Sequence, residues 1–249
     1  MAFSAAALGL AVIALAALWI ARHQEAVSKQ GVVAKSEAAR LAQDMVRSES
    51  TQNRPAHDVA TPAAVPALAA ITEAQRAVEA QMVAAQTAYT QARQDLDPAR
   101  LLDLAQLATA DAITDGQKRV RTFAAANGAL RESVDLAAFH FSSELRDRGV
   151  AEAAVREAIS TYRSGTEKEL PWIKRIRDAD DRYAAALWSM LDFAARAHGQ
   201  WRVTPDSDRK PEFTSPAVAR LHDDIIHQAR LAEMQAEFAS KQLREVTGK

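Results

Sequence analysis

The chain has 249 residues, of which 48% are hydrophobic and 25% charged, the composition of a folded protein rather than a disordered one. Lys and Arg number 31 against 32 Asp and Glu, and both signs are spread along the chain, so the basic excess typical of a nucleic-acid binder is missing. The absence of cysteine excludes disulfides, thiolate metal sites, thiol catalysis and a lipid-modified N-terminal cysteine.

The fold class follows from the residue types. Alanine makes up about a fifth of the chain, aromatic residues make up 6%, and Gly and Pro number 8 each. Alanine is the best helix former, whereas strands favour β-branched and aromatic residues. The sequence therefore predicts an all-α protein.

The first predicted element is a transmembrane helix. Residues 2–21 carry no charge, and as a helix they would be about 30 Å long, the thickness of a hydrocarbon core. Trp19 lies near the end of the segment, where an aromatic ring prefers the headgroup level. A signal peptide is the alternative, with an A-x-A match at residues 14–16, but it would have a basic start and a shorter apolar run. We expect an uncleaved anchor over residues 1–22.

The orientation of this anchor stays open. Lys and Arg near the span occur only after it, at Arg22, Lys29, Lys35 and Arg40. The positive-inside rule would then place the large domain in the cytoplasm, although the flank before the span is too short to carry a bias.

Two polar segments follow the anchor. Residues 23–53 are helix-prone with a thin apolar stripe and are predicted to form a stalk. Residues 54–66 contain three prolines, which cannot share one helix, so they are predicted to form an extended linker. The remaining residues, 67–249, are expected to form one helical bundle domain.

Helical periodicity dominates this domain, with apolar positions three and four residues apart. The predicted helices run from Leu68 to Leu96, from Pro98 to about Ile113, from the turn at Thr114-Asp115-Gly116 to Arg148, from Val150 to Gly165, from Thr166 or Leu170 to Arg196, and from Pro216 nearly to the C-terminus. A proline-bearing loop is expected over residues 201–214. Long helices joined by short turns predict an antiparallel bundle.

Helix starts are marked by local signals. Asp97-Pro98 and Ser215-Pro216 each predict an N-cap followed by a proline in the first turn. Thr166 with Glu169 predicts a capping box, and Leu170-Pro171 is an alternative start for the same helix. The last helix is expected to bury Val218, Leu221, Ile225, Ala229, Ala232, Ala236 and Leu243.

One group of residues suggests a metal site: His222, Asp223, Asp224 and His227. The two histidines are five residues apart, about 140° around a helix, and cannot bind the same ion from a regular helix. A di-iron bundle would need Glu-x-x-His on two helices, which this chain lacks. We expect an exposed polar face, with a metal-dependent hydrolase as the alternative.

Three polar residues lie on predicted inward faces. Asp180, close to Arg177 and Trp188, would either pair with an arginine across the bundle or line a ligand pocket. Asn127 and Gln75 would fix helix register, as buried amides do in helical assemblies. The two amides would either hydrogen-bond each other or bond Asp180.

The aromatic residues Trp172, Trp188, Trp201 and Phe213 are expected to cap the core around the last two helices, with docking of a partner as the alternative. No Gly-rich phosphate loop, G-x-S-x-G elbow or H-E-x-x-H motif is present in the sequence. The sequence therefore predicts no enzyme of a common class, with no catalytic residue, cofactor or bound metal.

Trp201-Arg202-Val203, a polar proline-bearing loop, Phe213 and a terminal helix together resemble uncharacterised bacterial membrane-anchored all-helical envelope proteins. The likeness covers about the last fifty residues, and the lipidated cysteine of some members is absent. It implies a bacterial source and a domain outside the cytoplasm.

The functional prediction is a single-pass protein of the bacterial inner membrane, anchored by residues 2–21, with the periplasm favoured over the cytoplasm as the side of its domain. It would contact other proteins or copies of itself, or support the envelope, without binding nucleic acid. A ligand-sensing bundle using Asp180 is the first alternative, and the metal-dependent hydrolase is the second.

Overall fold

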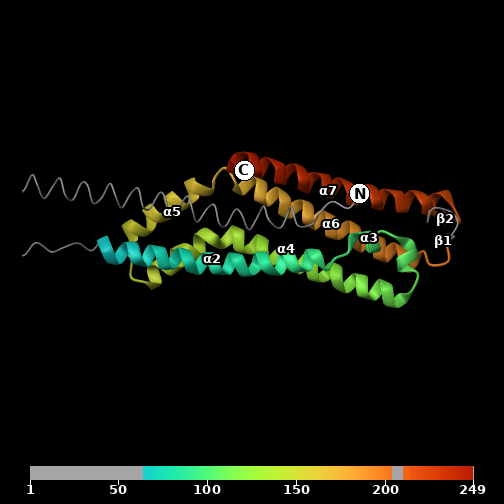
Figure 1. Cartoon of the computed structure of the whole chain (residues 1–249), viewed down its shortest axis with the longest axis horizontal. Helices are drawn as coiled ribbons and strands as arrows, with labels where there is room; N and C mark the ends of the chain where they lie inside the picture. Colours follow the sequence, from blue (N-terminus) through green and yellow to red (C-terminus); the bar gives the residue numbers. More distant parts are fainter. Residues whose placement is uncertain (1–63, 204–209, 249) are drawn as a thin grey trace, which may run out of the picture.

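The computed structural model describes residues 64–203 and 210–248, and these are mostly helical (Figure 1). In chain order the elements are α2 (Ala64–Gln94), α3 (Pro98–Leu101), the 3₁₀ helix η2 (Leu104–Leu107), α4 (Ala110–Asp147), α5 (Glu152–Thr166), α6 (Leu170–Arg196), β1 (Trp201–Val203), β2 (Pro211–Phe213) and α7 (Pro216–Thr247). The predicted all-α class is confirmed for this part of the chain.

The predicted membrane anchor (1–22) and stalk (23–53) lie outside the described residues. The last three residues of the expected linker, 64–66, are the first turn of α2, and the rest of that linker also lies outside. Among residues 64–203 and 210–248, no helix combines the length and the hydropathy that a membrane span requires.

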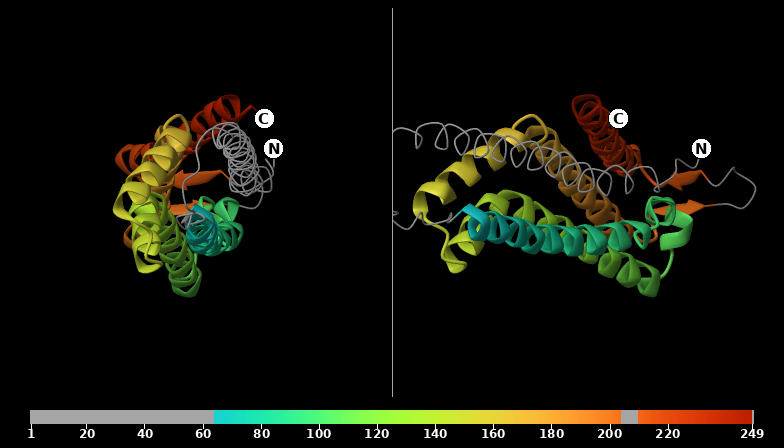
Figure 2. Two further views of the ribbon diagram at one scale, coloured as in Figure 1. Left: turned by 90° about the vertical axis from the view of Figure 1, so that its left-hand side faces the viewer. Right: turned by 60° about the vertical axis from the view of Figure 1, so that its left-hand side comes forward.

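Successive long helices run in opposite directions. Figure 1 shows this for α2 and α4, for α4 and α6, and for α6 and α7. Each of these pairs is packed together, so the order of the helices in space follows their order in the chain. In the views of Figures 1 and 2, α7 lies at the opposite edge of the bundle from α2. It packs chiefly along α6, with β2 close to its first turns.

The main core lies between α2, α4, α6 and the first half of α7, which contributes Ile225, Ala229 and Ala232. Phe123, Leu187, Met190 and Leu191 are almost completely buried there, and burying each such side chain contributes about 1.5–3 kcal/mol. A second cluster, which includes Phe141 and Val155, packs the short helix α5 against α4 and the beginning of α2. Both clusters use the apolar positions that the helical periodicity selects.

The helix predicted from Pro98 to about Ile113 is wrong, because α3 ends at Leu101 and is followed by η2 before α4 begins. The predicted turn at residues 114–116 is wrong as well. Helix α4 begins at Ala110, where the Thr109 side chain accepts a hydrogen bond from the Ala112 amide at 3.2 Å, and it runs through Gly116 without interruption. A Cβ at Gly116 would lie 2.6 Å from Leu191 Cδ2 and 2.8 Å from Leu101 Cδ2. The glycine is therefore required by close packing of α4 against these leucines and does not mark a turn.

The predicted caps differ in outcome. Pro98 begins α3 as expected, but Asp97 has φ 48° and its side chain caps nothing. The predicted capping box is wrong, because Thr166 is the last residue of α5 and its hydroxyl donates to carbonyls of that helix. The alternative start is observed, since α6 begins at Leu170. Ser215 caps α7 as predicted, with its hydroxyl accepting from the Val218 amide at 3.3 Å.

The segment expected as a loop over residues 201–214 contains a short β-hairpin. Trp201 pairs with Phe213 and Arg202 with Glu212 in an antiparallel register, and the Arg202 guanidinium binds the Glu212 carboxylate at 2.6 Å. Trp201 and Phe213 both pack on the core. Side chains that alternate between the core and solvent stabilise this hairpin at the end of the bundle (Figure 2).

Helix α7 turns a different residue inward at its start. Leu221 was expected in the core but is 54% exposed, and its neighbour His222 is buried instead. Near the end of α7, Ser240 and Thr247 are buried as well. The other inward positions are Val218, His222, Ile225, Ala229, Ala232, Ala236, Ala239 and Leu243, of which Val218 is half-buried. Their spacing alternates between four and three residues, which Leu221 would interrupt.

Candidate functional site

The inward carboxylate of α6 lies in a buried cluster of charges. Asp180 is 1% exposed. Its Oδ1 accepts a hydrogen bond from Arg93 Nη1 at 2.7 Å, and its Oδ2 accepts one from the Tyr89 hydroxyl at 2.8 Å. Arg177 Nη2 lies 3.2 Å from Oδ2. Of the two expected roles, pairing with an arginine across the bundle is the one that the geometry shows.

Helical spacing explains how two distant segments supply this cluster. Tyr89 and Arg93 are four residues apart on α2, and Arg177 and Asp180 are three apart on α6. Residues at these spacings share a helix face. Helices α4 and α5 separate α2 from α6 in the chain. The spacing within each helix can therefore be read from the sequence, but the contact between the two pairs cannot.

The cluster carries more positive than negative charge. It contains two guanidinium groups and one carboxylate, and the phenol stays neutral because burial, and secondarily the charge of Asp180, raises the pKa of Tyr89. The guanidinium carbon of Arg177 lies 4.1 Å from the centre of the Tyr89 ring, a cation–π contact. Burial opposes the charge of Arg93, but Tyr89 and Asp180 outweigh this effect and raise the pKa of Arg93.

A second polar layer joins α4 to the same part of α6. Asn127 is fully buried and donates from Nδ2 to the Arg177 carbonyl at 3.0 Å and to Asp181 Oδ1 at 2.6 Å. Arg131 bridges Asp178 and Asp181, each at 2.7 Å. Asn127 therefore lies inward as predicted, but it bonds neither Gln75 nor Asp180. The buried amide of α2 is Gln86, which donates to Thr90 at 3.1 Å, whereas Gln75 is half-buried.

The buried cluster has few open positions. Both oxygens of Asp180 already bind protein donors, so the carboxylate offers no exposed face to a ligand. Five buried side-chain atoms in the described part of the chain have no hydrogen-bond partner, and three of them belong to α2, α4 and α6: Gln86 Oε1, Asn127 Oδ1 and Arg177 Nη1. Each such atom costs about 1–3 kcal/mol. The arrangement fixes how α2, α4 and α6 pack together.

The residues that suggested a metal do not converge. His222 is buried between the rings of Phe213 and Phe193, with centroids 5.0 and 5.9 Å away, and its Nδ1 lies 3.2 Å from Asp223 Oδ1. Asp224 and His227 are exposed. Across residues 64–203 and 210–248, no three His, Asp or Glu side chains are grouped closely enough to hold a metal ion.

The four aromatic residues that were expected to cap the core, Trp172, Trp188, Trp201 and Phe213, are half-buried. Trp188, Trp201 and Phe213 pack against the main core. Trp172 packs at the far end of α6 and meets the Phe238 ring edge-on, with centroids 6.1 Å apart. The Arg175 guanidinium lies 4.5 Å from the centre of the Trp172 ring.

A groove runs along the outer side of α6 and α7. It has a volume of about 480 Å³ and is lined by Arg175, Asp178 and Arg182 from α6 and by Leu231, Met234 and Phe238 from α7, among others. The three apolar side chains of α7 are exposed by 44%, 65% and 57%. The sequence interpretation gave them no role, because it followed only the inward positions of α7.

No protein-family model, no curated protein and no solved structure matches the chain.

Proposed function

We propose that the chain is a non-enzymatic, membrane-anchored interaction protein of a bacterial envelope, which binds a helix of another protein chain through the outer face of α7. The observation that carries this proposal is the exposure of Leu231, Met234 and Phe238 on one helix. Contiguous exposed apolar side chains on a folded domain mark contact surfaces.

The position of α7 supports a contact with another helix. It is 32 residues long and packs chiefly along α6. Of its four exposed large apolar residues, Leu231, Met234 and Phe238 follow spacings of three and four. An amphipathic helix presents such positions as one stripe, and a partner helix can lay its own apolar face against it. The uncharged segment 2–21 supports the membrane anchor.

The buried charges support a structural role for the interior. The Asp180 carboxylate is bound by Arg93, Arg177 and Tyr89, so this cluster holds helices together and leaves the outer surface for recognition. The ligand-sensing alternative would need an accessible polar group at this place.

Site-specific photo-crosslinking of the full chain in intact membranes tests the proposal. A photoreactive residue at Met234 should give a crosslinked product whose joined peptide is identified by mass spectrometry. The same residue at Ala125, which is exposed on α4, should give none. Absence of products from Met234, Leu231 and Phe238 alike would refute the proposed interaction.

A further inference from the structure

Helix α7 carries a second heptad pattern on its outer face. Eight residues are spaced alternately four and three apart, and all of them are exposed: Arg220, Asp224, His227, Leu231, Met234, Phe238, Lys241 and Glu245. From the first to the last, this outer stripe is about 38 Å long at 1.5 Å per residue. Its central members Leu231, Met234 and Phe238 are apolar, as a helix partner on this face would require.

The order of residues in the outer stripe is self-complementary. Consider two copies of α7 packed antiparallel, with the two-fold axis passing between residues 232 and 233. In this register Leu231 of each copy faces Met234 of the other. One step outward, His227 faces Phe238. Beyond them Asp224 faces Lys241 and Arg220 faces Glu245, so the apolar centre is closed at both ends by opposite charges.

The flank of the outer stripe obeys the same symmetry. Residues that directly precede alternate stripe positions face each other across an antiparallel helix pair, and charged side chains there set partner choice and orientation. In the stated register Arg230 faces Glu237 of the second copy, and Asp223 faces Arg244. The other flank places Gln228 opposite Gln235, two uncharged amides.

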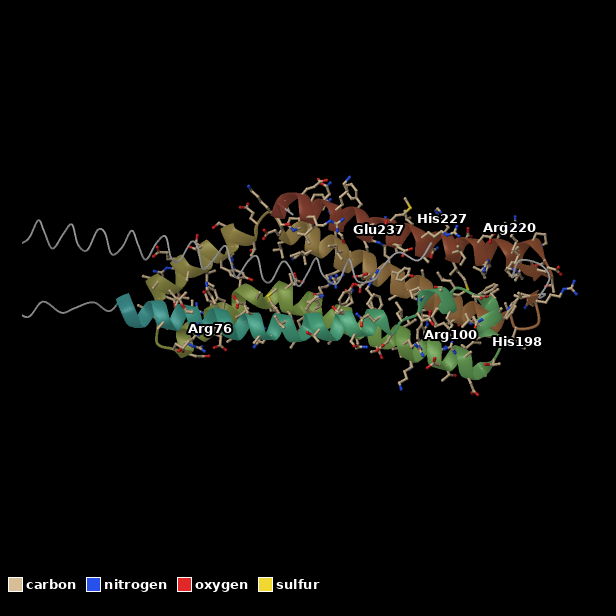
Figure 3. All side chains as sticks on the ribbon, viewed as in Figure 1. Arg76, Arg100, His198, Arg220, His227 and Glu237 are labelled. Carbon is tan, nitrogen blue, oxygen red and sulfur yellow. The ribbon has the colours of Figure 1, made fainter. Side chains whose placement is uncertain are left out.

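Most of these charges have no partner within one chain. Arg220, Asp224, Arg230, Glu237 and Lys241 make no side-chain ion pair or hydrogen bond with any residue in the described ranges 64–203 and 210–248. Figure 3 shows Arg220, His227 and Glu237 at successive levels along α7. Two stripe or flank carboxylates have weak local contacts: Asp223 with His222 at 3.2 Å, and Glu245 with Gln242 at 2.9 Å.

Other arrangements of the two helices bring like charges together. Sliding one copy by a heptad in one direction places Arg230 opposite Arg230, and in the other direction it places Arg230 opposite Arg244 and Glu237 opposite Glu237. A parallel pair in register places each stripe residue opposite itself. Like charges at such positions are destabilising, so the charges select one orientation and one register.

We propose that the partner of α7 is a second copy of this chain, bound antiparallel through the outer stripe in this register. The inference rests on the proposed interaction function and names its partner. The contact is isologous, since each residue pair occurs twice about a two-fold axis, as in most homodimers. The inner face of each α7 stays on its own α6, so two bundles lie on either side of the paired helices.

Cysteine crosslinking tests the register directly, because the chain has no cysteine of its own. Two differently tagged full-length chains, one with Leu231→Cys and one with Met234→Cys, are mixed in detergent and oxidised gently. They should form a mixed disulfide in high yield. The matched control pairs Leu231→Cys with Lys241→Cys on the same face, which only a shifted register would join, and should give little product.

Charge reversal provides a second measurement. Arg230→Glu should weaken dimerisation of the full chain about tenfold in sedimentation experiments, because two symmetric attractive pairs become repulsive. Adding Glu237→Arg should restore the affinity, whereas Arg163→Glu on the exposed side of α5 should leave it unchanged. Circular dichroism checks that each variant keeps its helix content and unfolding temperature.

The outcomes separate this inference from the function on which it rests. A photo-crosslink from Met234 to a different protein, with no disulfide between copies, would keep the interaction function and overturn the second copy. No crosslink of either kind would overturn both. A disulfide in the control pair, or no rescue by Glu237→Arg, would overturn the antiparallel register.

Discussion

Replacing Asp180 by asparagine should destabilise the bundle by about 3–5 kcal/mol, the cost of removing one partner from a buried ion pair. Asparagine preserves the shape of the side chain but removes its charge. Arg177, whose side chain is 3% exposed, then stays in the interior without its counter-ion. Arg93 is 17% exposed and can recover part of its hydration, so most of the loss comes from Arg177.

Two further variants locate the effect. Asp178→Asn removes a carboxylate that is 51% exposed and pairs with Arg131, and it should cost less than about 1 kcal/mol. Arg93→Met leaves one guanidinium with one carboxylate, so it should cost less than Asp180→Asn. Unfolding of the full chain in urea, followed by circular dichroism, measures all three. Equal small losses for Asp180→Asn and Asp178→Asn would refute the view that this cluster is buried and coupled.

Three more outcomes follow from local structure. Gly116→Ala should lower the free energy of unfolding, because overpacking against leucine costs about 1–3 kcal/mol. Gly128→Ala, with open space around it, should raise the free energy of unfolding by about 0.5–1 kcal/mol. Urea unfolding that gave both changes the same sign would contradict the packing argument. Ser215→Ala should cost about 1 kcal/mol through loss of the α7 cap, and an unchanged unfolding midpoint would count against that cap. Burial raises the pKa of Tyr162 and Tyr183 to about 12 each, so the stability from their neutral forms is present below pH 10 and lost as the pH rises through 12; tyrosinate absorbance appearing near pH 10 in the folded protein would show that these phenols are not buried.

The helices were predictable because one residue type and one period dominate the sequence. Alanine-rich segments with apolar residues three and four apart allow little besides helix, and the structure has helices there. Gly116 was misread because a glycine that ends a helix and one that admits a neighbouring helix look alike in sequence. Only the positions of Leu191 and Leu101 distinguish them.

The inward position of Asp180 could be predicted from the sequence, but its partners on α2 could not. The period of α6 places Asp180 inward, and this proved right. Its partners Arg93 and Tyr89 lie on α2, and the sequence does not fix which turn of α2 meets which turn of α6. Contacts between helices distant in sequence depend on the order and stagger of the whole bundle, which local patterns do not contain.

The outer stripe of α7 could not be predicted from the periodicity of apolar residues. Only three of its eight residues are strongly apolar, and the inward face of the same helix has a more complete apolar pattern. Exposure in the folded chain removes that ambiguity, because it shows that Leu231, Met234 and Phe238 lie at the surface, where they line a groove beside α6. The complementarity of the remaining charges can then be tested register by register.

The inner and outer charges of this domain should therefore be separable by experiment. Asp180 is satisfied within one chain, so its loss should change the stability of the bundle and affect dimerisation only as far as α6 and α7 unfold. Arg230 makes no ion pair within the described residues of one chain, so its reversal should change dimerisation at constant stability. Measuring unfolding and sedimentation on Asp180→Asn and Arg230→Glu together distinguishes a charge that builds the fold from one that recognises a partner. If both variants changed both properties equally, Arg230 would have to contribute to the packing of the bundle, contrary to its exposure on α7.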